Sequence, residues 1–118
     1  MVIVYRLETV DGIGVYNTEA LNCVHLDRQR HPLPQDDSLL MHNIGDRRIR
    51  GYHFGFSSIE QLRHWLYNDK WIRDVSKHGI FLSVYEAAEV YIGNSQMCFN
   101  RSTAYLKSQN NLIEFFKL

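Results

Sequence analysis

Residues 2–10 alternate between two faces and are rich in β-branched side chains, a pattern typical of a strand. Arg6 falls on the same face of this strand as two valines. Because an isolated buried charge is costly, we expect Arg6 to reach either a partner or a cleft. The glycine-containing stretch 11–14 predicts a turn, after which residues 15–16 are expected to resume a short strand.

The clearest junction in the chain lies at residues 52–66, where an aromatic run ends in two serines and a helical pattern begins. Two pairs of residues have the spacing of a helix capping box: Ser57 with Glu60, and Ser58 with Gln61. The apolar residues that follow recur at the spacing of one buried helix face: Ile59, Leu62, Trp65 and Leu66. Gly55 interrupts the aromatic run, which in a strand indicates a bulge or a close approach to the backbone.

The remaining elements follow from periodicity and from breaker residues. Helical patterns and their end signals predict helices over residues 17–26, 38–42 and 68–78. Alternation predicts strands over residues 80–86, 89–92, 96–99 and 112–116, with a loop over 31–38 and a short irregular or helical segment over 102–107. Strands at both ends with helices between them predict one α+β domain over residues 1–118, with a mostly antiparallel sheet and two to four short helices.

Charge and composition narrow the class of function. The 118 residues carry 13 basic and 13 acidic side chains, for a formal net charge of zero. Such a balance argues against general binding to nucleic acid or to anionic membranes. No apolar run approaches the length that spans a bilayer, and the amino terminus lacks the pattern of a signal peptide. With only two cysteines, far apart in sequence, we expect a reduced cytoplasmic protein.

Complete catalytic or metal-binding motifs are missing from the sequence. The densest set of soft ligands is Cys23, His25, His31 and His42, whose spacing fits no common zinc motif, so we expect no metal site. No Gly-x-Ser-x-Gly motif of a serine hydrolase occurs. The pair Asp36 and Asp37 is expected in a solvated loop rather than as an acid–base dyad.

Arginines form the most prominent polar group in the middle of the chain: Arg28, Arg30, Arg47, Arg48 and Arg50. Guanidinium groups bind phosphates and carboxylates in a bidentate manner, and tyrosine beside arginine is typical of protein interfaces. Arg47, Arg48, Arg50 and Tyr52 are therefore the predicted partner-binding residues. Ordinary solubility explains the same arginines equally simply.

A second set of polar residues is defined by its order along the predicted elements. Arg6 lies on the first strand, Ser57 and Ser58 join a middle strand to a helix, and Gln96 begins a late strand. This order resembles the arginine, serine and glutamate of ADP-ribosyltransferases. The resemblance implies a ligand-binding cleft for NAD or another nucleotide, lined by these four residues. The chain departs from that pattern at Gln96, which cannot carry the negative charge of the catalytic glutamate.

A resemblance to small uncharacterised phage and prophage proteins covers more of the chain. It rests on four segments: residues 4–8, 54–62, 84–86 and 93–99. It implies an accessory protein in the cytoplasm of a bacterial host, which binds a macromolecular partner and inhibits a host or defence protein, without a cofactor. The alternative is an NAD-binding or nucleotide-binding protein of the ADP-ribosyltransferase type, active or degenerate, so the sequence leaves enzymatic activity open.

Overall fold

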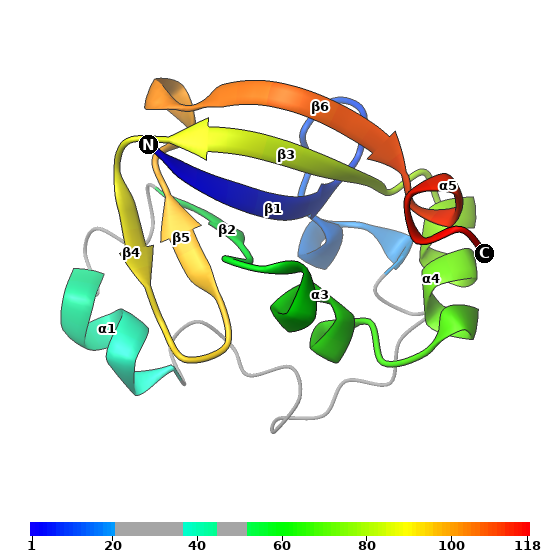
Figure 1. The fold of residues 1–118 in the computed structure, drawn as a ribbon, viewed down its shortest axis with the longest axis horizontal. Coiled ribbons are helices and arrows are strands. Elements are labelled where there is room, and N and C mark those ends of the chain that lie inside the picture. The colour runs from blue at the N-terminus through cyan, green and yellow to red at the C-terminus, as the bar shows by residue number, and fades with distance from the viewer. Residues whose placement is uncertain (21–36, 45–51) are drawn as a thin grey trace.

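A computed structural model describes residues 1–20, 37–44 and 52–118 of the chain. Its largest sheet has the order β1-β3-β6 and is antiparallel throughout (Figure 1). The three strands are β1 (Val2–Glu8), β3 (Phe81–Ala87) and β6 (Tyr105–Asn111). Strands β1 and β3 confirm the two strands that alternation predicted over residues 2–10 and 80–86.

A second antiparallel sheet continues from the edge of the first. It has the order β2-β5-β4, formed by β2 (His53–Gly55), β5 (Met97–Phe99) and β4 (Val90–Ile92). The two sheets join where Tyr5 and Phe56 exchange backbone hydrogen bonds of 2.9 and 2.7 Å. A Cβ on Gly55 would lie 2.6 Å from Cγ1 of Val4 and 2.9 Å from the carbonyl oxygen of Tyr5, which confirms the expected close approach at this glycine.

The helices are short and begin at identifiable caps. The described α-helices are α1 (Ser38–Ile44), α3 (Ile59–Trp65), α4 (Asp69–Lys77) and α5 (Leu112–Phe116), and 3-10 turns occur at η1 (Val15–Asn17) and η4 (Arg101–Thr103). Ser58 is the N-cap of α3, with its hydroxyl accepting from the Gln61 amide at 3.1 Å. The Gln61 side chain in turn accepts from the Ser57 amide at 2.9 Å. The second of the two proposed capping pairs is therefore confirmed.

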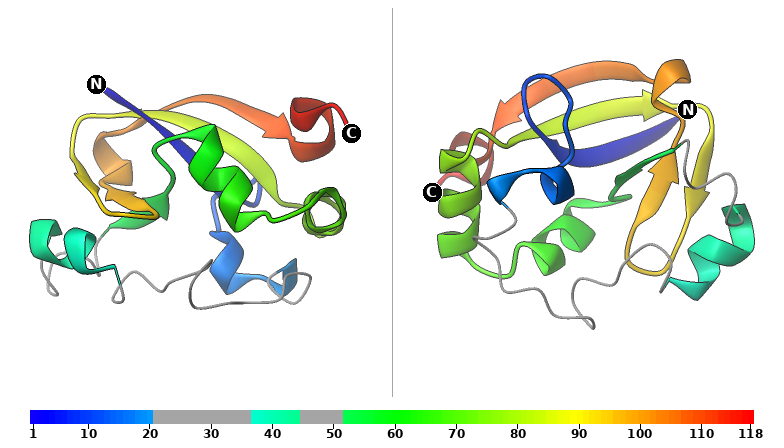
Figure 2. Two further views of the ribbon diagram at one scale, coloured as in Figure 1. Left: turned by 60° about the horizontal axis from the view of Figure 1, so that its bottom comes forward. Right: turned by 180° about the vertical axis from the view of Figure 1, so that it is seen from behind.

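The main core lies between the β1-β3-β6 sheet and the elements on one of its faces, η1, α3 and α4 (Figure 2). Its buried members include Leu62, Leu66, Trp65, Trp71, Ile72, Leu82 and Leu112. This arrangement is an α+β fold with antiparallel sheets and short helices, as the sequence predicts. None of the described helices has the length and hydropathy of a membrane span.

The carboxyl end differs from the sequence prediction. The irregular or helical segment expected over residues 102–107 is found only in η4, because the outer strand β6 begins at Tyr105, and residues 112–116 form helix α5, where a strand was expected. The side chain of Asn111 caps α5 by accepting from the Glu114 amide at 3.1 Å. As an outer strand, β6 is largely exposed on both faces and so lacks the alternation that reveals a half-buried strand.

Two further predictions need correction, and one lies largely outside the described chain. Residues 15–17 form the 3-10 turn η1 and not a strand. Asp37 is 3% exposed at the start of α1, so it does not lie in a solvated loop. Burial of Asp37 is tolerated because its carboxylate accepts several backbone hydrogen bonds. Residues 21–36, which include most of the helix predicted at 17–26, are outside the described residues.

Candidate functional site

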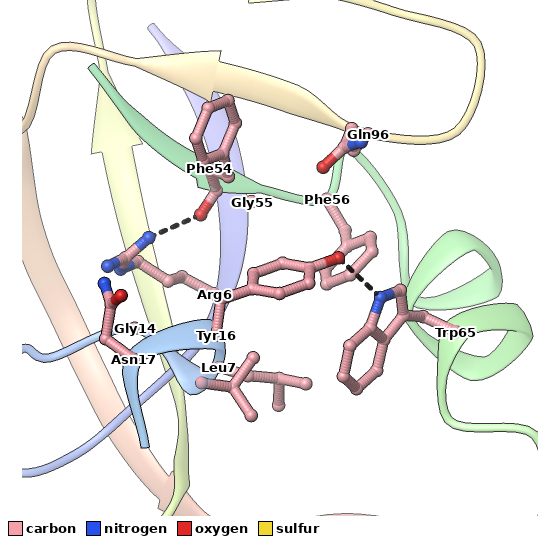
Figure 3. A pocket seen from close by; sticks show the side chains of 11 residues that line it. Arg6, Leu7, Gly14, Tyr16, Asn17, Phe54, Gly55, Phe56, Trp65 and Gln96 are labelled. Atoms are coloured by element: carbon pink, nitrogen blue, oxygen red, sulfur yellow. Dashed lines mark hydrogen bonds between the residues drawn. The ribbon is translucent and has the colours of Figure 1, made fainter. Parts of the chain in front are cut away.

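A pocket of about 310 Å³ lies where β1 meets β2, closed on its other sides by η1 and α3 (Figure 3). Its lining includes Arg6 from β1, Tyr16 and Asn17 from η1, Trp65 from α3, and Gln96, which precedes β5. Arg6 and Gln96 approach this pocket from opposite sides (Figure 3). Segments that are far apart in the sequence thus contribute to one concave site.

Arg6 is buried and held in place by two hydrogen bonds. Its Nε donates to Oε1 of Glu8 at 2.7 Å, and its Nη1 donates to the carbonyl oxygen of Phe54 at 2.7 Å. Burial lowers the pKa of Arg6, while the hydrogen bond to Glu8 opposes that shift. Nη2 faces Gly14, where an added Cβ would lie 2.7 Å from it. Both the predicted partner and the predicted cleft are therefore present.

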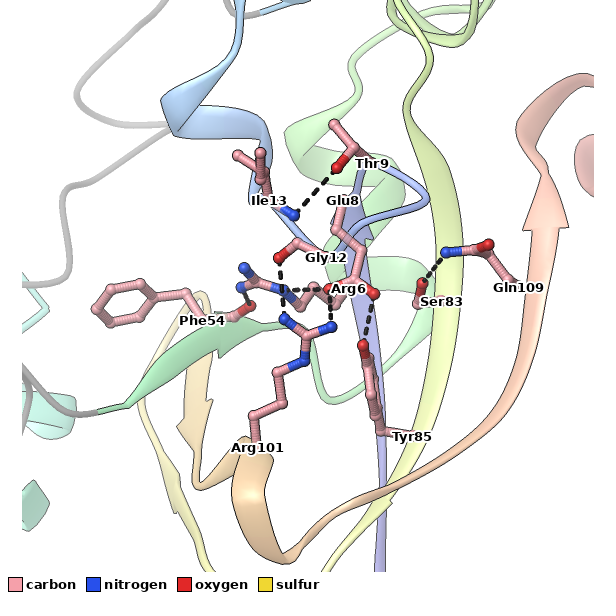
Figure 4. Close-up of polar contacts among 10 residues, drawn as sticks. All are labelled: Arg6, Glu8, Thr9, Gly12, Ile13, Phe54, Ser83, Tyr85, Arg101 and Gln109. Atoms are coloured by element: carbon pink, nitrogen blue, oxygen red, sulfur yellow. Dashed lines mark hydrogen bonds and ion pairs between the residues drawn. The ribbon is translucent and has the colours of Figure 1, made fainter.

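Glu8 is the centre of a buried polar cluster behind the pocket (Figure 4). Its Oε2 accepts from the Tyr85 hydroxyl at 2.5 Å, and its Oε1 lies 4.0 Å from Nη2 of Arg101. Burial, followed by the hydrogen bond to Glu8, raises the pKa of Tyr85 to about 12, so the phenol remains a donor. With two guanidinium groups around one carboxylate, the cluster carries a net positive charge next to the pocket.

His53 lies beside this cluster and is favoured in its neutral form. Burial lowers the pKa of His53, and the positive charges of Arg6 and Arg101 lower it further. Its Nδ1 is buried and has no hydrogen-bond partner among the described residues. The neutral ring packs against Phe99, with the two ring centroids 6.3 Å apart. His53 therefore adds no further positive charge near neutral pH.

Aromatic side chains form the wall of the pocket on the side of α3. The indole Nε1 of Trp65 donates to the Tyr16 hydroxyl at 2.9 Å, and the two rings meet edge to face at a centroid distance of 5.8 Å. Phe56 lies against the same indole, with centroids 6.4 Å apart. Burial raises the pKa of Tyr16, which keeps its hydroxyl protonated near neutral pH. No motif in the sequence indicated that Tyr16 belongs to this site.

The structure brings together two of the four residues predicted to line a ligand cleft. Arg6 and Gln96 line the pocket, and Gln96 is 5% exposed. Ser57 and Ser58 are not among its lining residues, because both are engaged in capping α3. The Ser57 hydroxyl also donates to the side-chain oxygen of Gln61 at 3.0 Å.

The predicted partner-binding residues are only partly described. Arg47, Arg48 and Arg50 lie outside the described residues. Tyr52 donates its hydroxyl to Oε2 of Glu89 at 2.8 Å, and this hydrogen bond is the main reason that its pKa is raised to about 12. Cys23, His25 and His31 also lie outside the described residues, so the expectation that metal is absent stays a prediction.

Asp37 holds the turn that precedes Gln96. Its Oδ1 accepts from the amides of Leu40 and Asn94 at 3.1 and 3.0 Å, and its Oδ2 accepts from the Ser95 amide at 3.1 Å. Burial raises the pKa of Asp37, but these hydrogen bonds together lower it by more, so the net shift is downward. One carboxylate therefore joins α1 to the turn between β4 and β5.

The polar and aromatic groups of the pocket are suited to holding a ligand. Among the described residues, its lining offers one guanidinium, the amides of Asn17 and Gln96, and an aromatic wall, and it includes no carboxylate. Because Gln96 is a neutral amide, it can orient a ligand but cannot stabilise a developing positive charge.

Comparisons with known proteins place the chain among phage proteins. It is 29% identical over 102 residues to the uncharacterised 19.7 kDa protein in the motB-dexA intergenic region of Enterobacteria phage T4, an alignment that covers 69% of this chain and 61% of the relative. The chain thus spans less than two thirds of that relative. No solved structure matches the chain significantly. Residues 1–113 match the family described as Bacteriophage T4 Y00F protein, and the chain belongs to this family.

Proposed function

We propose that this phage-family protein binds a small ligand of the nucleotide class in the pocket beside Arg6. The observation that carries the proposal is that one pocket combines a buried guanidinium, an aromatic wall and the Gln96 amide. Ligand pockets of roughly 300–1,000 Å³ commonly combine apolar walls with a few placed polar groups. A volume of about 310 Å³ is enough for one ring system with an attached polar group.

Each part of the ligand has a matching surface in the pocket. A planar base packs against Tyr16, Phe56 and Trp65, since aromatic rings stack or meet edge to face favourably. A phosphate lies at the guanidinium of Arg6, whose Nη2 makes no hydrogen bond to the described residues. The net positive charge of the cluster around Glu8 favours an anion at that end. The Asn17 amide, on the exposed rim, supplies a further donor.

Isothermal titration calorimetry with AMP, NAD and ADP-ribose tests this function. We expect one or more of these ligands to bind the wild type, and Arg6→Lys to weaken that binding at least tenfold, because lysine keeps the charge but loses the planar fork. Lys77→Ala, an exposed change at the end of α4, is the matched control and should bind as the wild type does. Absence of binding by all three ligands at millimolar concentration would overturn the proposal.

A second candidate function is binding of a bacterial host or defence protein. The observation in its favour is the outer edge of β6, where the side chains of Tyr105 and Leu106 are 69% and 52% exposed. An exposed edge strand is a ready template for a strand of another protein. A pull-down from bacterial lysate should recover a specific partner with the wild type and lose it with Leu106→Pro, which removes a backbone donor. Repeated absence of any specific partner would count against this function.

A further inference from the structure

Gln96 lies across the pocket from Arg6, on a turn that the protein holds in place. It is 5% exposed, and the two residues approach the pocket from opposite sides (Figure 3). The backbone carbonyl of Gln96 accepts from the Gly93 amide at 2.9 Å, and the Asp37 carboxylate accepts from the two amides in between. A buried amide on positioned backbone loses little conformational entropy when it binds a ligand. Gln96 is therefore placed to recognise one end of a ligand whose other end lies at Arg6.

The side-chain amide of Gln96 presents a hydrogen-bond donor beside an acceptor. Its oxygen has two lone pairs and its nitrogen has two N–H groups, so it can bind a ligand while it keeps a bond within the protein. Adenine matches this pattern on both of its polar edges, because its N6 amino group donates and either N1 or N7 accepts beside it. The N7 edge of guanine carries only acceptors, and a pyrimidine covers less of the aromatic wall. Of the common bases, adenine therefore fits this end of the pocket best.

The Arg6 end of the pocket provides for one phosphate group. Arg6 is the only charged side chain among the described residues of the lining. Two of its nitrogens already donate within the protein, Nε to Glu8 and Nη1 to the Phe54 carbonyl, which leaves Nη2 for a ligand. The nearby guanidinium of Arg101 is not part of the lining and donates to the Gly12 carbonyl at 3.0 Å. A second phosphate would therefore meet no second cation among the described lining residues.

Charge also decides on which side of Gln96 such a ligand lies. Together with Phe56 and Trp65, Gln96 borders a second pocket of about 350 Å³, whose lining includes Glu60. The side chain of Glu60 is exposed, and its carboxylate repels a phosphate. A ligand that carries both a base and a phosphate is therefore favoured in the first pocket, beside Arg6.

We propose that Gln96 recognises the base of an adenosine monophosphate whose phosphate lies at Arg6, so that the first pocket selects a nucleoside monophosphate over a dinucleotide. This inference rests on the proposed function and names the kind of nucleotide that the pocket takes. The N6 amino group donates to the side-chain oxygen of Gln96, and the adjacent ring nitrogen accepts from its amide nitrogen. The adenine ring packs on the aromatic wall between these two polar ends.

Calorimetry with ligands that differ by one group tests this role of Gln96. The set consists of AMP, adenosine, ADP-ribose and purine riboside 5′-monophosphate, which is AMP without the N6 amino group. For the wild type, we expect loss of the amino group to weaken binding by about fivefold or more, because the amide oxygen then loses its partner. ADP-ribose should bind no more tightly than AMP, since its second phosphate gains no cation.

A matched substitution assigns the effect to the side chain. Gln96→Met keeps the length of the side chain but removes the amide, so AMP and purine riboside monophosphate should bind to it equally. The gain in affinity from adenosine to AMP should stay as in the wild type, because Arg6 is unchanged. Lys77→Ala is again the control. The urea midpoint checks the fold of Gln96→Met, and the wild-type comparisons decide the matter if this variant is unstable.

The outcomes distinguish this inference from the proposed function. If AMP binds but its amino group contributes nothing, or if ADP-ribose binds much more tightly than AMP, the inference fails and the proposed function stands. An undiminished contribution of the amino group in folded Gln96→Met would also overturn the inference, because another group would then recognise the base. If no nucleotide binds to the wild type, the proposed function and the inference both fail.

Discussion

Arg6 and Glu8, two residues apart on one face of β1, form a buried ion pair with Nε 2.7 Å from Oε1. Their side chains are only 8% and 1% exposed. The same guanidinium holds the Phe54 carbonyl of β2, so the pair contributes to the junction between the two sheets and supports the wall of the first pocket. Its loss is therefore expected to affect both folding and ligand binding.

Replacing Glu8 by glutamine is expected to destabilise the fold strongly. The substitution leaves the buried Arg6 charge without its counter-ion, which lowers the free energy of unfolding by about 3 kcal/mol. Urea unfolding at neutral pH measures the change. Lys70→Ala, which breaks an ion pair in which the lysine is 79% exposed, is the control and should leave the midpoint nearly unchanged. Equal effects of the two substitutions would contradict a structural role for the buried pair.

Gly55→Ala is expected to weaken the junction between the sheets. The new Cβ would lie 2.9 Å from the backbone oxygen of Tyr5, which cannot move without disturbing β1, so we expect a loss of about 2 kcal/mol in the free energy of unfolding. Gly79 provides the contrast, because a Cβ there meets no atom within 4 Å, although its φ is +80°. Since asparagine tolerates that conformation, Gly79→Asn should cost less in the same urea experiment. A Gly55→Ala midpoint equal to that of the wild type would contradict the close approach.

The contribution of Asp37 to stability is expected to disappear in acid. Its folded pKa is lowered from the ordinary value of 3.8, so the ionised carboxylate stabilises the fold above that value, and the stabilisation is lost as the pH falls through the folded pKa. The free energies of unfolding of the wild type and Asp37→Asn should therefore differ clearly at pH 7, and this difference should shrink as the pH falls below 3.8. A difference that does not change with pH would indicate that the charge of Asp37 is unimportant.

The cap of α5 gives a direct test of the structure at the carboxyl end. Asn111→Ala removes the oxygen that accepts from the Glu114 amide, and we expect a loss of about 1 kcal/mol in the free energy of unfolding. Asn111→Asp keeps an acceptor at the same place and should retain most of the stability. Both are measured by urea unfolding. If alanine and aspartate behaved alike, residues 112–116 would not begin as a capped helix.

Local signals predicted much of the fold. Alternation located β1 and β3, and the capping spacing of Ser58 and Gln61 located the start of α3. Alternation and capping spacing were sufficient to locate these elements, because each signal depends on residues no more than four positions apart. The carboxyl end was predicted wrongly, since apolar residues are as frequent in the short helix α5 as in a strand, and β6 shows no buried face.

The candidate site was only partly predictable. Arg6 could be selected because a charge on an apolar strand face requires a partner or a cleft. Tyr16 and Trp65 could not be predicted as site residues, because their contact joins η1 to α3 across a long separation in sequence. Ser57 and Ser58 were assigned both to capping and to the ligand cleft, and the structure places them in the cap.

Where periodicity and helix caps are strong, local patterns were enough to identify the strands and helices, and the apolar face of the first strand marked Arg6 as a residue in need of a partner. The choice of Glu8 as this partner, and the pocket that Gln96 shares with Arg6, became visible only in the folded chain. Periodicity depends on near neighbours in the sequence, whereas the pocket depends on the Tyr5–Phe56 junction, which brings β1 beside β2.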